Sequence, residues 1–434
     1  MGQHLAKLLS SEEQDIVLVD KDTDRLARID SNYNLMTQIG SPTSFKSLRE
    51  SGADECDLFI AVTPLEEKNL IACSIAKSLG ASRTVARIDN IEYLSPDHRP
   101  FFLQHGINDL IYPEHLAALE IKTALQHTWA RQWFELHKGE LILIGVKIRE
   151  NSAIVGQKLK DITMSRHNFH VSAITRRHES IIPRGDDIIC PGDIVYFTTT
   201  PDHVDQLRQL CGKEERVIRK IMIMGGSRIA VALARMLGNE FDIKIIEENI
   251  ERCRELPMKC PNCDIIHGDG RDNDILIEEG IEEIDAFIAL TDSSETNILA
   301  SLSAKEFGVG KTIAEVENIQ FISEAEGLNI GTIINKKLLA SSKIFQILLA
   351  ADSESSKFLS LADAEVAELE VKPGAKVTKA PVKDLKLSRD MTIGGLVRDG
   401  RGILVSGMTV IQPGDRVVVF CTSGVIHKVE KLFN

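Results

Sequence analysis

The sequence predicts an α/β protein with two Rossmann-like, doubly wound parallel-sheet domains, each followed by a small α+β lobe. Three observations lead to this prediction. The chain repeats itself in the order A–B–A′–B′, its A blocks alternate strand-like with helix-like segments, and A′ contains a glycine-rich turn between a strand and a helix. At 434 residues the chain is also too long for one hydrophobic core and should divide into several domains.

The repeat is visible residue by residue. The segment GADECDLFIAVT at 52–63 returns 228 residues later as GIEEIDAFIALT at 280–291. In the B blocks, the Pro-Gly-Asp sequence at 191–193 returns at 413–415. Agreement at fixed offsets over this length indicates a duplicated pair of domains.

Block A predicts a parallel sheet. The apolar, strand-like run at 16–19 leads to a helix-like segment at 24–29, and the run at 58–62 leads to one at 70–79. A further short strand follows at 84–88. Strands that alternate with helices at this spacing indicate parallel pairing with right-handed crossovers.

Block B has a different pattern. Short β-branched stretches at 171–175 and 194–198 are interrupted by Pro and Gly, and one helix-like segment at 202–210 closes the block. This pattern is typical of a small α+β unit. We therefore expect a first nucleotide lobe without its first strand at 1–112, a linking helix at 113–136 and a first C-terminal lobe at 137–213. A second nucleotide lobe should follow at 217–335, linking helices at 336–364 and a second C-terminal lobe at 365–434.

Composition narrows the class of function. The net charge of −13 argues against nucleic-acid binding, which needs clustered Lys and Arg. The sequence contains no run of about 18 apolar residues that would predict a membrane-spanning helix. Its eight cysteines are scattered, which indicates a protein of the reducing cytoplasm.

Block A′ carries a nucleotide-binding fingerprint in altered form. The strand-like segment at 220–224 runs into Gly225-Gly-Ser-Arg-Ile-Ala230, and a helix-like segment follows at 231–237. Gly225 suits the tight turn, position 227 is where backbone approaches a pyrophosphate, and Ala230 allows close packing of helix and strand. The N–H groups at the start of the helix would face the phosphates. Ser227 replaces the middle glycine of the usual pattern.

An acidic residue strengthens this prediction. Glu247 ends the next strand, about 20 residues further on, where a carboxylate accepts hydrogen bonds from ribose hydroxyls. A carboxylate there repels a 2′-phosphate, so NAD(H) is favoured over NADP(H). In block A, Asp20 holds the matching position, and Gly2 matches the third fingerprint position. The alternative is a glycine-rich turn with a solvated acid at a strand end.

Other loop residues should line the same crevices at the carboxyl ends of the strands. They form three matched pairs, Ser41 with Asp269, Thr63 with Thr291 and Arg87 with Glu315. The last pair has opposite charges. Arg87 could therefore contact a phosphate, whereas Glu315 would repel one. We therefore expect two sites that are not equivalent. Alternatively, Arg87 only pairs with a neighbouring carboxylate.

The Cys260-Pro-Asn-Cys263 segment resembles a metal or redox knuckle, with Cys253 before it and His267 after it. Block A has no cysteine in the matching segment, and the chain has no second C-x-x-C. We expect a loop with incidental thiols and no metal, with zinc or redox chemistry as the alternative. The sequence also lacks G-x-S-x-G, H-E-x-x-H and P-loop motifs, so we expect no catalytic residues and no enzyme.

Block A begins late in the repeated pattern. Gly2 aligns with Ala230, so a strand and turn equivalent to 220–228 would precede Met1. In a doubly wound sheet that strand is central, and we expect the natural protein to carry about ten more residues that form it. The alternative is a short form whose first lobe is degenerate or is completed by another chain.

In its A–B–A′–B′ order and its motifs, the chain resembles the peripheral NAD-binding subunits of Trk potassium-uptake systems, the TrkA family, built from two tandem RCK (regulator of K⁺ conductance) modules. The residues that carry the resemblance are Val17–Asp20, Ala61–Thr63 with Glu67 and Asn69, Val85–Arg87, their counterparts in A′, and both Pro-Gly-Asp segments. The resemblance covers essentially the whole chain.

The resemblance implies a cytoplasmic regulatory subunit, peripheral on the inner face of the membrane, that binds NAD(H) or ATP/ADP. It implies a homo-oligomeric ring, a tetramer, that gates a potassium-transporting membrane subunit of the TrkH/TrkG kind. It makes Asp20 and Glu247 ribose ligands. The implied phosphate contacts are Gly225, Gly226, Ser227, Arg228 and Ile229, and the other implied lining residues are Gly2, Ser41, Thr63, Arg87, Asp269, Thr291 and Glu315.

Three alternatives remain open at this point. The first is an NAD-dependent oxidoreductase, which would consume NADH instead of only binding it. The second is an RCK regulator of a potassium channel or a potassium/proton exchanger, because the RCK fold serves all of these partners. The third makes the C-terminal lobes the sensors of another ligand, such as a cyclic dinucleotide.

Overall fold

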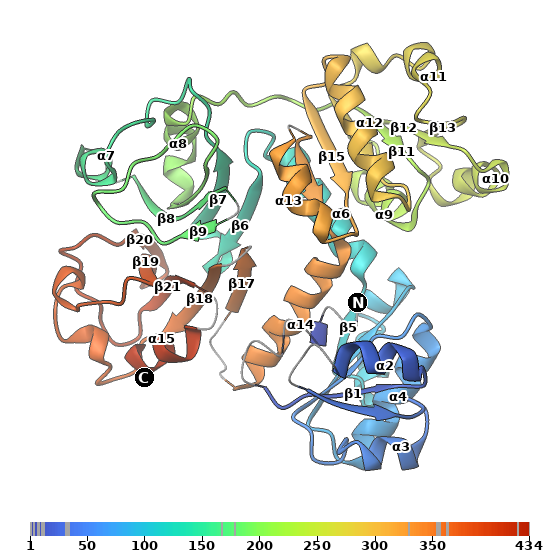
Figure 1. The fold of residues 1–434 in the computed structure, drawn as a ribbon, viewed down its shortest axis with the longest axis horizontal. Coiled ribbons are helices and arrows are strands. Elements are labelled where there is room, and N and C mark those ends of the chain that lie inside the picture. The colour runs from blue at the N-terminus through green and yellow to red at the C-terminus, as the bar shows by residue number, and fades with distance from the viewer. Residues whose placement is uncertain are drawn as a thin grey trace. The chain divides into compact units, whose positions relative to one another are not determined.

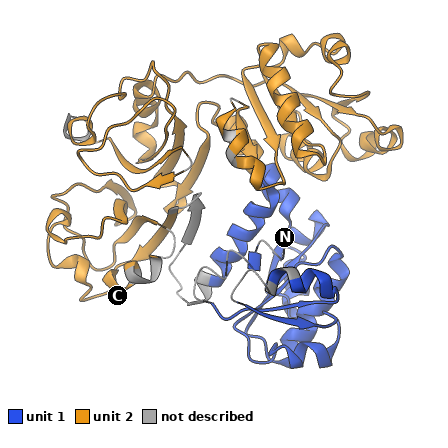
Figure 2. Ribbon diagram, in the orientation of Figure 1, with its two compact units in different colours: residues 1–119, 335–348 blue, residues 120–334, 349–434 orange. Residues whose placement is uncertain are grey.

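A computed structural model gives the fold, and Figure 1 shows its helices and strands. The structure describes residues 2, 5, 6, 9, 14–30, 35–165, 168–177, 179–328, 330–352, 357–361, 364–422 and 425–433. The chain forms two compact units (Figure 2). The first unit comprises Met1–Leu119 with Asn335–Leu348, and the second comprises Glu120–Ile334 with Leu349–Asn434.

The second nucleotide lobe, in the second unit, is built on a six-stranded parallel sheet. Its strands lie in the order β13-β12-β11-β14-β15-β16, which is that of a doubly wound fold. The bounds of the strands are β11 Lys220–Met224, β12 Asp242–Glu247, β13 Cys263–His267, β14 Ala286–Ala289, β15 Lys311–Glu315 and β16 Thr332–Ile334. The helices are α9 Arg228–Leu237, α10 Ile250–Lys259, α11 Asn273–Glu278, α12 Ser294–Glu306 and α13 Gln320–Gly327.

The first nucleotide lobe, in the first unit, repeats this strand order in two pieces. Strand β1 pairs with β2, and β3, β4 and β5 form a second parallel sheet. The bounds are β1 Val17–Asp20, β2 Met36–Ile39, β3 Leu58–Ala61, β4 Arg83–Arg87 and β5 Asp109–Ile111, with helices α2 Thr23–Asp30, α3 Phe45–Glu50, α4 Glu66–Leu79 and α5 Arg99–Gln104. In the second lobe β11 pairs with both β12 and β14, whereas no strand among the described residues joins β1 to β3.

The two C-terminal lobes, both in the second unit, are matching five-stranded antiparallel sheets. The strand orders are β6-β7-β10-β8-β9 and β17-β18-β21-β19-β20. The strands of the first are β6 Gln132–Leu136, β7 Leu141–Lys147, β8 Phe169–Arg176, β9 Glu179–Ile181 and β10 Ile194–Thr199, with helices α7 Leu159–Ser165 and α8 Val204–Leu210. Those of the second are β17 Lys357–Leu361, β18 Ala364–Glu370, β19 Met391–Arg398, β20 Arg401–Leu404 and β21 Arg416–Thr422, with helix α15 Ile426–Phe433.

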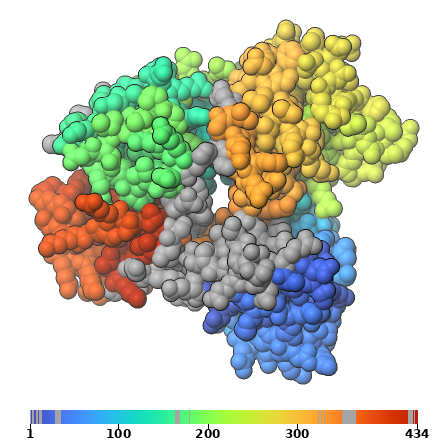
Figure 3. Space-filling view, in the orientation of Figure 1, coloured from blue at the N-terminus to red at the C-terminus, as the bar shows by residue number. Residues whose placement is uncertain are grey.

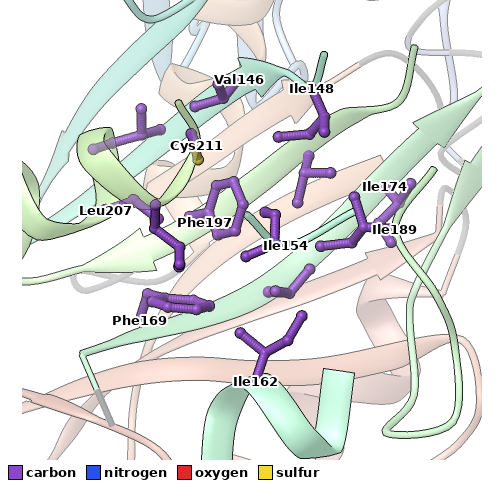
Figure 4. Packing of buried hydrophobic residues seen from close by; sticks show 14 of the residues in the cluster. Val146, Ile148, Ile154, Ile162, Phe169, Ile174, Ile189, Phe197, Leu207 and Cys211 are labelled. Atoms are coloured by element: carbon purple, nitrogen blue, oxygen red, sulfur yellow. The ribbon is translucent and has the colours of Figure 1, made fainter. Parts of the chain in front are cut away.

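The first C-terminal lobe has its own core, and the two lobes share a second one. In the first lobe Phe169 and Phe197 meet edge to face, with ring centroids 5.5 Å apart, inside a cluster that α8 covers with Leu207 (Figure 4). A second cluster joins buried side chains of both lobes, among them Tyr196 and Phe420. Figure 3 shows the surfaces of the two lobes in contact. Burial of this apolar surface joins the lobes into one body.

The predicted fold class is confirmed, but the linking segments differ from the expectation. We expected a helix over 113–136, whereas α6 spans Pro113–Gln126 and residues 132–136 form β6, antiparallel to β7. Trp133 packs against the lobe core, and the backbone N–H of Arg131 donates to Gly145 O. Similarly, α14 spans Lys336–Asp352, and β17 and the start of β18 lie in the segment 336–364 expected to be helical. In both places the segment pairs with the edge of a C-terminal-lobe sheet, and this pairing stabilises a strand instead of the expected helix.

No helix in the described part of the chain is long and apolar enough to cross a membrane.

Candidate functional site

The glycine turn of the second lobe has the geometry that its sequence predicts. Gly225 has φ of +98°, a backbone conformation that favours glycine, and its N–H donates to Ile246 O at 2.8 Å. A Cβ at this position would also lie 2.9 Å from Leu290 O. The chain therefore passes closely over the carboxyl ends of β12 and β14 before α9 begins.

Ser227 caps helix α9. Its Oγ accepts a hydrogen bond of 3.4 Å from the backbone N–H of Ala230, and its backbone is extended, as an N-cap requires. The serine that replaces the middle glycine of the fingerprint thus starts the helix. Ile229 is buried, so only its backbone N–H can face a phosphate at this helix N-terminus.

Glu247 lies directly beside this turn. Its Oε2 accepts from the backbone N–H of Gly226 at 2.7 Å, and its Oε1 accepts from the backbone N–H of Asn249 at 2.8 Å. A carboxylate offers about four acceptor positions, so two remain for ribose hydroxyls. Sequence reasoning did not single out Arg252, whose Nε donates to Gly226 O at 2.9 Å. The carboxylate and the glycine turn are thus held together as one rigid unit.

Asp269 follows β13 and pairs with a cation that the sequence reasoning missed. The guanidinium of Arg271 donates to both carboxylate oxygens, with Nε 2.9 Å from Oδ1 and a terminal nitrogen 2.7 Å from Oδ2. This hydrogen-bonded pair lowers the pKa of Asp269. Asp269 is therefore an ionised residue that positions Arg271 two residues after it, a spacing that is readable in the sequence.

A buried asparagine fixes the threonine loop in each nucleotide lobe. In the second lobe, Asn297 Oδ1 accepts from Thr291 N at 3.0 Å and from Thr291 Oγ1 at 2.7 Å. Its Nδ2 donates to Thr291 O and to Glu315 O, both at 2.9 Å. The side chain of Asn297 is fully buried. It therefore holds together the carboxyl ends of β14 and β15.

The first lobe contains the same clamp. Asn69 Oδ1 accepts from Thr63 N at 2.8 Å and from Thr63 Oγ1 at 2.7 Å, and Nδ2 donates to Thr63 O and to Arg87 O. Both threonine hydroxyls thus donate within the protein and keep only acceptor capacity for a ligand. The two asparagines matched in the sequence repeat, but their role could not be read from it.

Arg87 and Glu315 occupy equivalent strand ends with opposite charges. A terminal nitrogen of Arg87 lies 2.7 Å from Asp89 Oδ1 and 3.9 Å from Glu114 Oε1, so the arginine pairs with neighbouring carboxylates. Glu315 is a buried residue, 3% exposed. A bound anion would compete with Asp89 for Arg87, whereas the crevice of the second lobe has an acidic residue, Glu315, at the equivalent position.

The remaining predicted residues of the first lobe also have protein partners. Asp20 pairs with Arg25 at 3.2 Å, and Ser41 Oγ lies 3.2 Å from Thr43 Oγ1. Gly2 is helical, and a Cβ on it would lie 3.5 Å from a methyl group of Val62. Gly2 therefore lies next to the end of the run that contains β3.

A cavity of about 210 Å³ opens at the carboxyl ends of β3 and β4 in the first unit. Its lining comprises Val62, Thr63, Pro64, Arg87, Pro113, Glu114, Lys336 and Lys337. Glu114 is buried, and its Oε2 has no hydrogen-bond partner among the described residues. Of these residues the sequence reasoning found only Thr63 and Arg87, because nothing local marks the first residues of α6 and α14 as lining.

The cysteine pair lies where α10 leads into β13. Cys260 is buried, and a hydrogen bond with Cys263 lowers the pKa of the Cys260 thiol and raises that of Cys263. Both cysteines are free thiols. Within the described residues, no group of three or more His, Cys, Asp and Glu side chains could hold a metal ion.

The Pro-Gly-Asp segments place buried carboxylates in the C-terminal lobes. Asp193 receives two hydrogen bonds from Arg176, at 2.8 and 2.7 Å, and Asp415 receives the same pair from Arg398 at the same distances. Each aspartate is 2% exposed. These charge-assisted pairs fix a turn to a strand in each lobe, so this part of the repeat is structural.

Comparison with known proteins follows the same division of the chain. The TrkA-N domain model matches residues 1–113 and 221–336, and the TrkA-C domain model matches residues 143–212 and 366–434. The chain is 31% identical over 442 residues to the Trk system potassium uptake protein TrkA of Halomonas elongata, with 100% of this chain and 96% of that protein covered. It is 30% identical to the TrkA homolog of Archaeoglobus fulgidus, with 100% and 98% covered.

Two solved structures of GsuK share this fold. The GsuK RCK domain superposes with a TM-score of 0.61 at 16% identity, covering 99% of this chain and 92% of that one. The GsuK channel bound to NAD superposes with a TM-score of 0.60, also at 16% identity, covering 99% of this chain and 76% of that one. At this identity the likeness extends to the fold, with both nucleotide lobes and both C-terminal lobes included.

Proposed function

Because the chain belongs to the TrkA family, with two TrkA-N and two TrkA-C domains, we propose that it is the regulatory subunit of a Trk-type potassium-uptake system. In this proposal it lies on the cytoplasmic face of the membrane and gates a potassium-transporting subunit of the TrkH/TrkG kind. Its full-length relatives carry the name of the Trk potassium uptake system, and none of those cited above is named as an enzyme.

The observation that carries the proposal is the Glu247–Gly226 contact beside the N-terminus of α9. In this proposal Glu247 accepts from the ribose hydroxyls, and the backbone N–H groups at the start of α9, after the glycine turn, donate to the phosphates. A carboxylate at this position disfavours a 2′-phosphate, so the ligand we propose is NAD(H), with ATP or ADP as the other adenine nucleotides that fit. The GsuK channel, which has the same fold, is described as bound to NAD.

The first lobe would bind nucleotide differently. Arg87 is already paired with Asp89, so an anion there must displace or extend that ion pair. In the second lobe, the buried Glu315 at the equivalent position disfavours phosphate at that point of the crevice. We propose two inequivalent sites in each chain, with phosphates held at the glycine turn in the second lobe.

In this proposal, the bound nucleotide would change transport by changing the arrangement of the subunits in an oligomer of this chain. A homo-oligomeric ring, a tetramer in this proposal, would have two arrangements, and the nucleotide would favour the one to which it binds more tightly. Coupling free energies of about 1–3 kcal/mol are typical and would change transport about 5- to 150-fold. The nucleotide acts as a ligand here and is not consumed.

Calorimetry of the purified chain with NADH, NAD and ATP tests the binding step, because it reports affinity and stoichiometry together. A parallel record of absorbance at the NADH band, with a panel of carbonyl compounds, tests for turnover. We expect binding without loss of NADH. No binding of any of the three nucleotides would overturn the proposal, and protein-dependent oxidation of NADH would favour an oxidoreductase.

A further inference from the structure

Five cationic side chains gather at the edge of the second nucleotide lobe that faces away from the glycine turn. The segment 211–219, which connects α8 to β11, meets the amino end of β15 there, because Arg216 lies against Gly310. We refer to the five side chains as the basic cluster, and they are Arg149, Lys213, Arg216, Lys305 and Lys311. All five belong to the second unit.

Hydrogen bonds fix this region around Thr128. The backbone N–H of Arg216 donates to Thr128 Oγ1 at 3.0 Å, and Lys311 Nζ lies 3.5 Å from Thr128 O and 3.4 Å from Ala130 O. The guanidinium of Arg216 lies against Gly310, where a Cβ would overlap it. The segment 211–219, the start of β15 and the turn before β6 are therefore held together.

Burial and neighbouring cations lower the pKa of each of the three lysines of the cluster. Burial, with Arg149 as the next cause, lowers the pKa of Lys213 to about 8. Burial and then Lys305 lower the pKa of Lys311 to about 7, and burial and then Arg149 and Arg216 lower that of Lys305. Burial is the largest cause of each shift and the neighbouring positive charges add to it, so the charged lysines cost free energy unless an anion compensates them.

In the part of the chain that the structure describes, no ion pair with a carboxylate supplies that compensation. Among the described residues, the side chains of Arg149, Lys213, Arg216 and Lys305 form neither an ion pair nor a hydrogen bond. Two glutamates are close, Glu135 and Glu215, but they act on His127 and not on these three lysines. Within the described chain, Lys311 has only the two backbone carbonyl groups of Thr128 and Ala130 as partners, so the cluster is a site of uncompensated positive charge in a chain with a net charge of −13.

The first nucleotide lobe provides an internal comparison. Arg83 holds the position of Lys311 and pairs with Asp109 on the neighbouring strand at 2.7 Å. Val85 and Ile313 are equivalent in the repeat. Val85 pairs with Asp109 in the first sheet and Ile313 pairs with Thr332 in the second, so Thr332 takes the place of Asp109 in the second lobe. The second lobe thus has a cation at the same position, buried in the case of Lys311, and lacks the carboxylate that pairs with it in the first lobe.

We propose that the basic cluster binds a multiply charged, phosphate-bearing anion at a site separate from the nucleotide crevice. Lys311 begins β15, whereas the crevice lies at its other end, four residues or about 13 Å away. Phosphate oxygens would accept from Lys213 and Lys305 and would supply the negative charge that the fold lacks there. An anion at this point also bridges the segment 211–219 to the second nucleotide lobe.

Binding of inorganic tripolyphosphate, measured by calorimetry at low salt, tests the proposal. The variant is Lys213→Gln with Lys305→Gln, two half-buried side chains without protein partners. The matched control is Lys77→Gln, at the position of Lys305 in the first lobe, where Nζ donates to Ala81 O and Ser82 O. Thermal unfolding and NADH binding of each variant verify that the fold and the nucleotide site are intact.

We expect the double variant to bind tripolyphosphate at least about tenfold more weakly than the wild type, and Lys77→Gln to bind it unchanged. A second arm uses vesicles of phosphatidylcholine and phosphatidylglycerol in equal amounts. If the wild-type protein sediments with these vesicles, the double variant does not, and neither binds tripolyphosphate, the phosphate belongs to a lipid headgroup. Equal binding by wild type and double variant, or no binding in either arm, would overturn the proposal.

Discussion

Glu247 and Gly226 are joined by a hydrogen bond of 2.7 Å that ties the end of β12 to the turn before α9. The same carboxylate also accepts from Asn249, so it is fixed before any ligand arrives. A fixed acceptor loses little entropy on binding, which favours affinity for a ribose. The turn, the acid and the helix N-terminus thus form one prearranged surface.

Replacement of this acid should weaken nucleotide binding. Glu247→Gln keeps the size of the side chain but removes the charge, and hydrogen bonds to charged groups contribute about 1.5–3 kcal/mol each. We expect the affinity for NADH to fall about tenfold or more in calorimetry. Glu248→Gln is the control, because Glu248 is exposed and only its backbone carbonyl is bonded. Equal affinity of Glu247→Gln and wild type would mean that Glu247 does not bind the ribose.

The asparagine clamp should be important for stability. Asn297→Ala leaves the buried carbonyl groups of Thr291 and Glu315 without their donor, at about 1–3 kcal/mol for each unsatisfied group. We expect the midpoint of thermal unfolding to fall by several degrees. The exposed Asn239→Ala serves as the control. An unchanged midpoint for Asn297→Ala would refute the clamp.

The contact between the C-terminal lobes depends on a glycine. A Cβ at Gly402 would overlap the carbonyl oxygen of Glu140, and its N–H donates to Glu140 Oε2 at 3.2 Å. Gly402→Ala should therefore separate the lobes locally and expose apolar surface to a hydrophobic dye. Gly327→Ala, where a Cβ meets nothing within 4 Å, should bind no extra dye. Identical dye binding by the two variants would contradict this packing.

Lys311 should make stability depend on pH. Its pKa is lowered to about 7 in the folded protein, mainly by burial, whereas an unfolded lysine titrates near 10.4. Between these values the unfolded state binds more protons, so stability should rise with pH, by at most about 1.4 kcal/mol per pH unit. Below pH 7 the penalty is fully present. Without added anion, Lys311→Met should lack this rise, and identical pH profiles would show that Lys311 is not desolvated.

Much of the fold could be predicted because local signals and the repeat agree. The strand, glycine turn and helix of block A′ each have their own sequence signal, and block A repeats most of them. The end of α6 at Gln126 could not be predicted, because residues 132–136 become a strand only by pairing with β7. Tertiary pairing there overrides a local helical preference.

The site was predicted in outline only. Glu247 and Gly225 could be singled out as candidates because a strand end and a tight turn have readable patterns, and their roles in binding stay predictions. The roles of Asn297 and Ser227 were missed, because a clamp and a cap are defined by partners and not by residue type. The pairing of Arg87 with Asp89 was one of two open interpretations, and only the geometry of the loop decides how that arginine is used in the free protein.

Potassium flux into vesicles that contain the membrane subunit tests the central claim most directly. The measurement compares flux with wild-type chain and with Glu247→Gln, each with and without saturating NADH. We expect NADH to change the flux about 5- to 150-fold with the wild type and much less with the variant. Flux that is the same with and without the chain, at every NADH concentration, would contradict the proposed regulatory function.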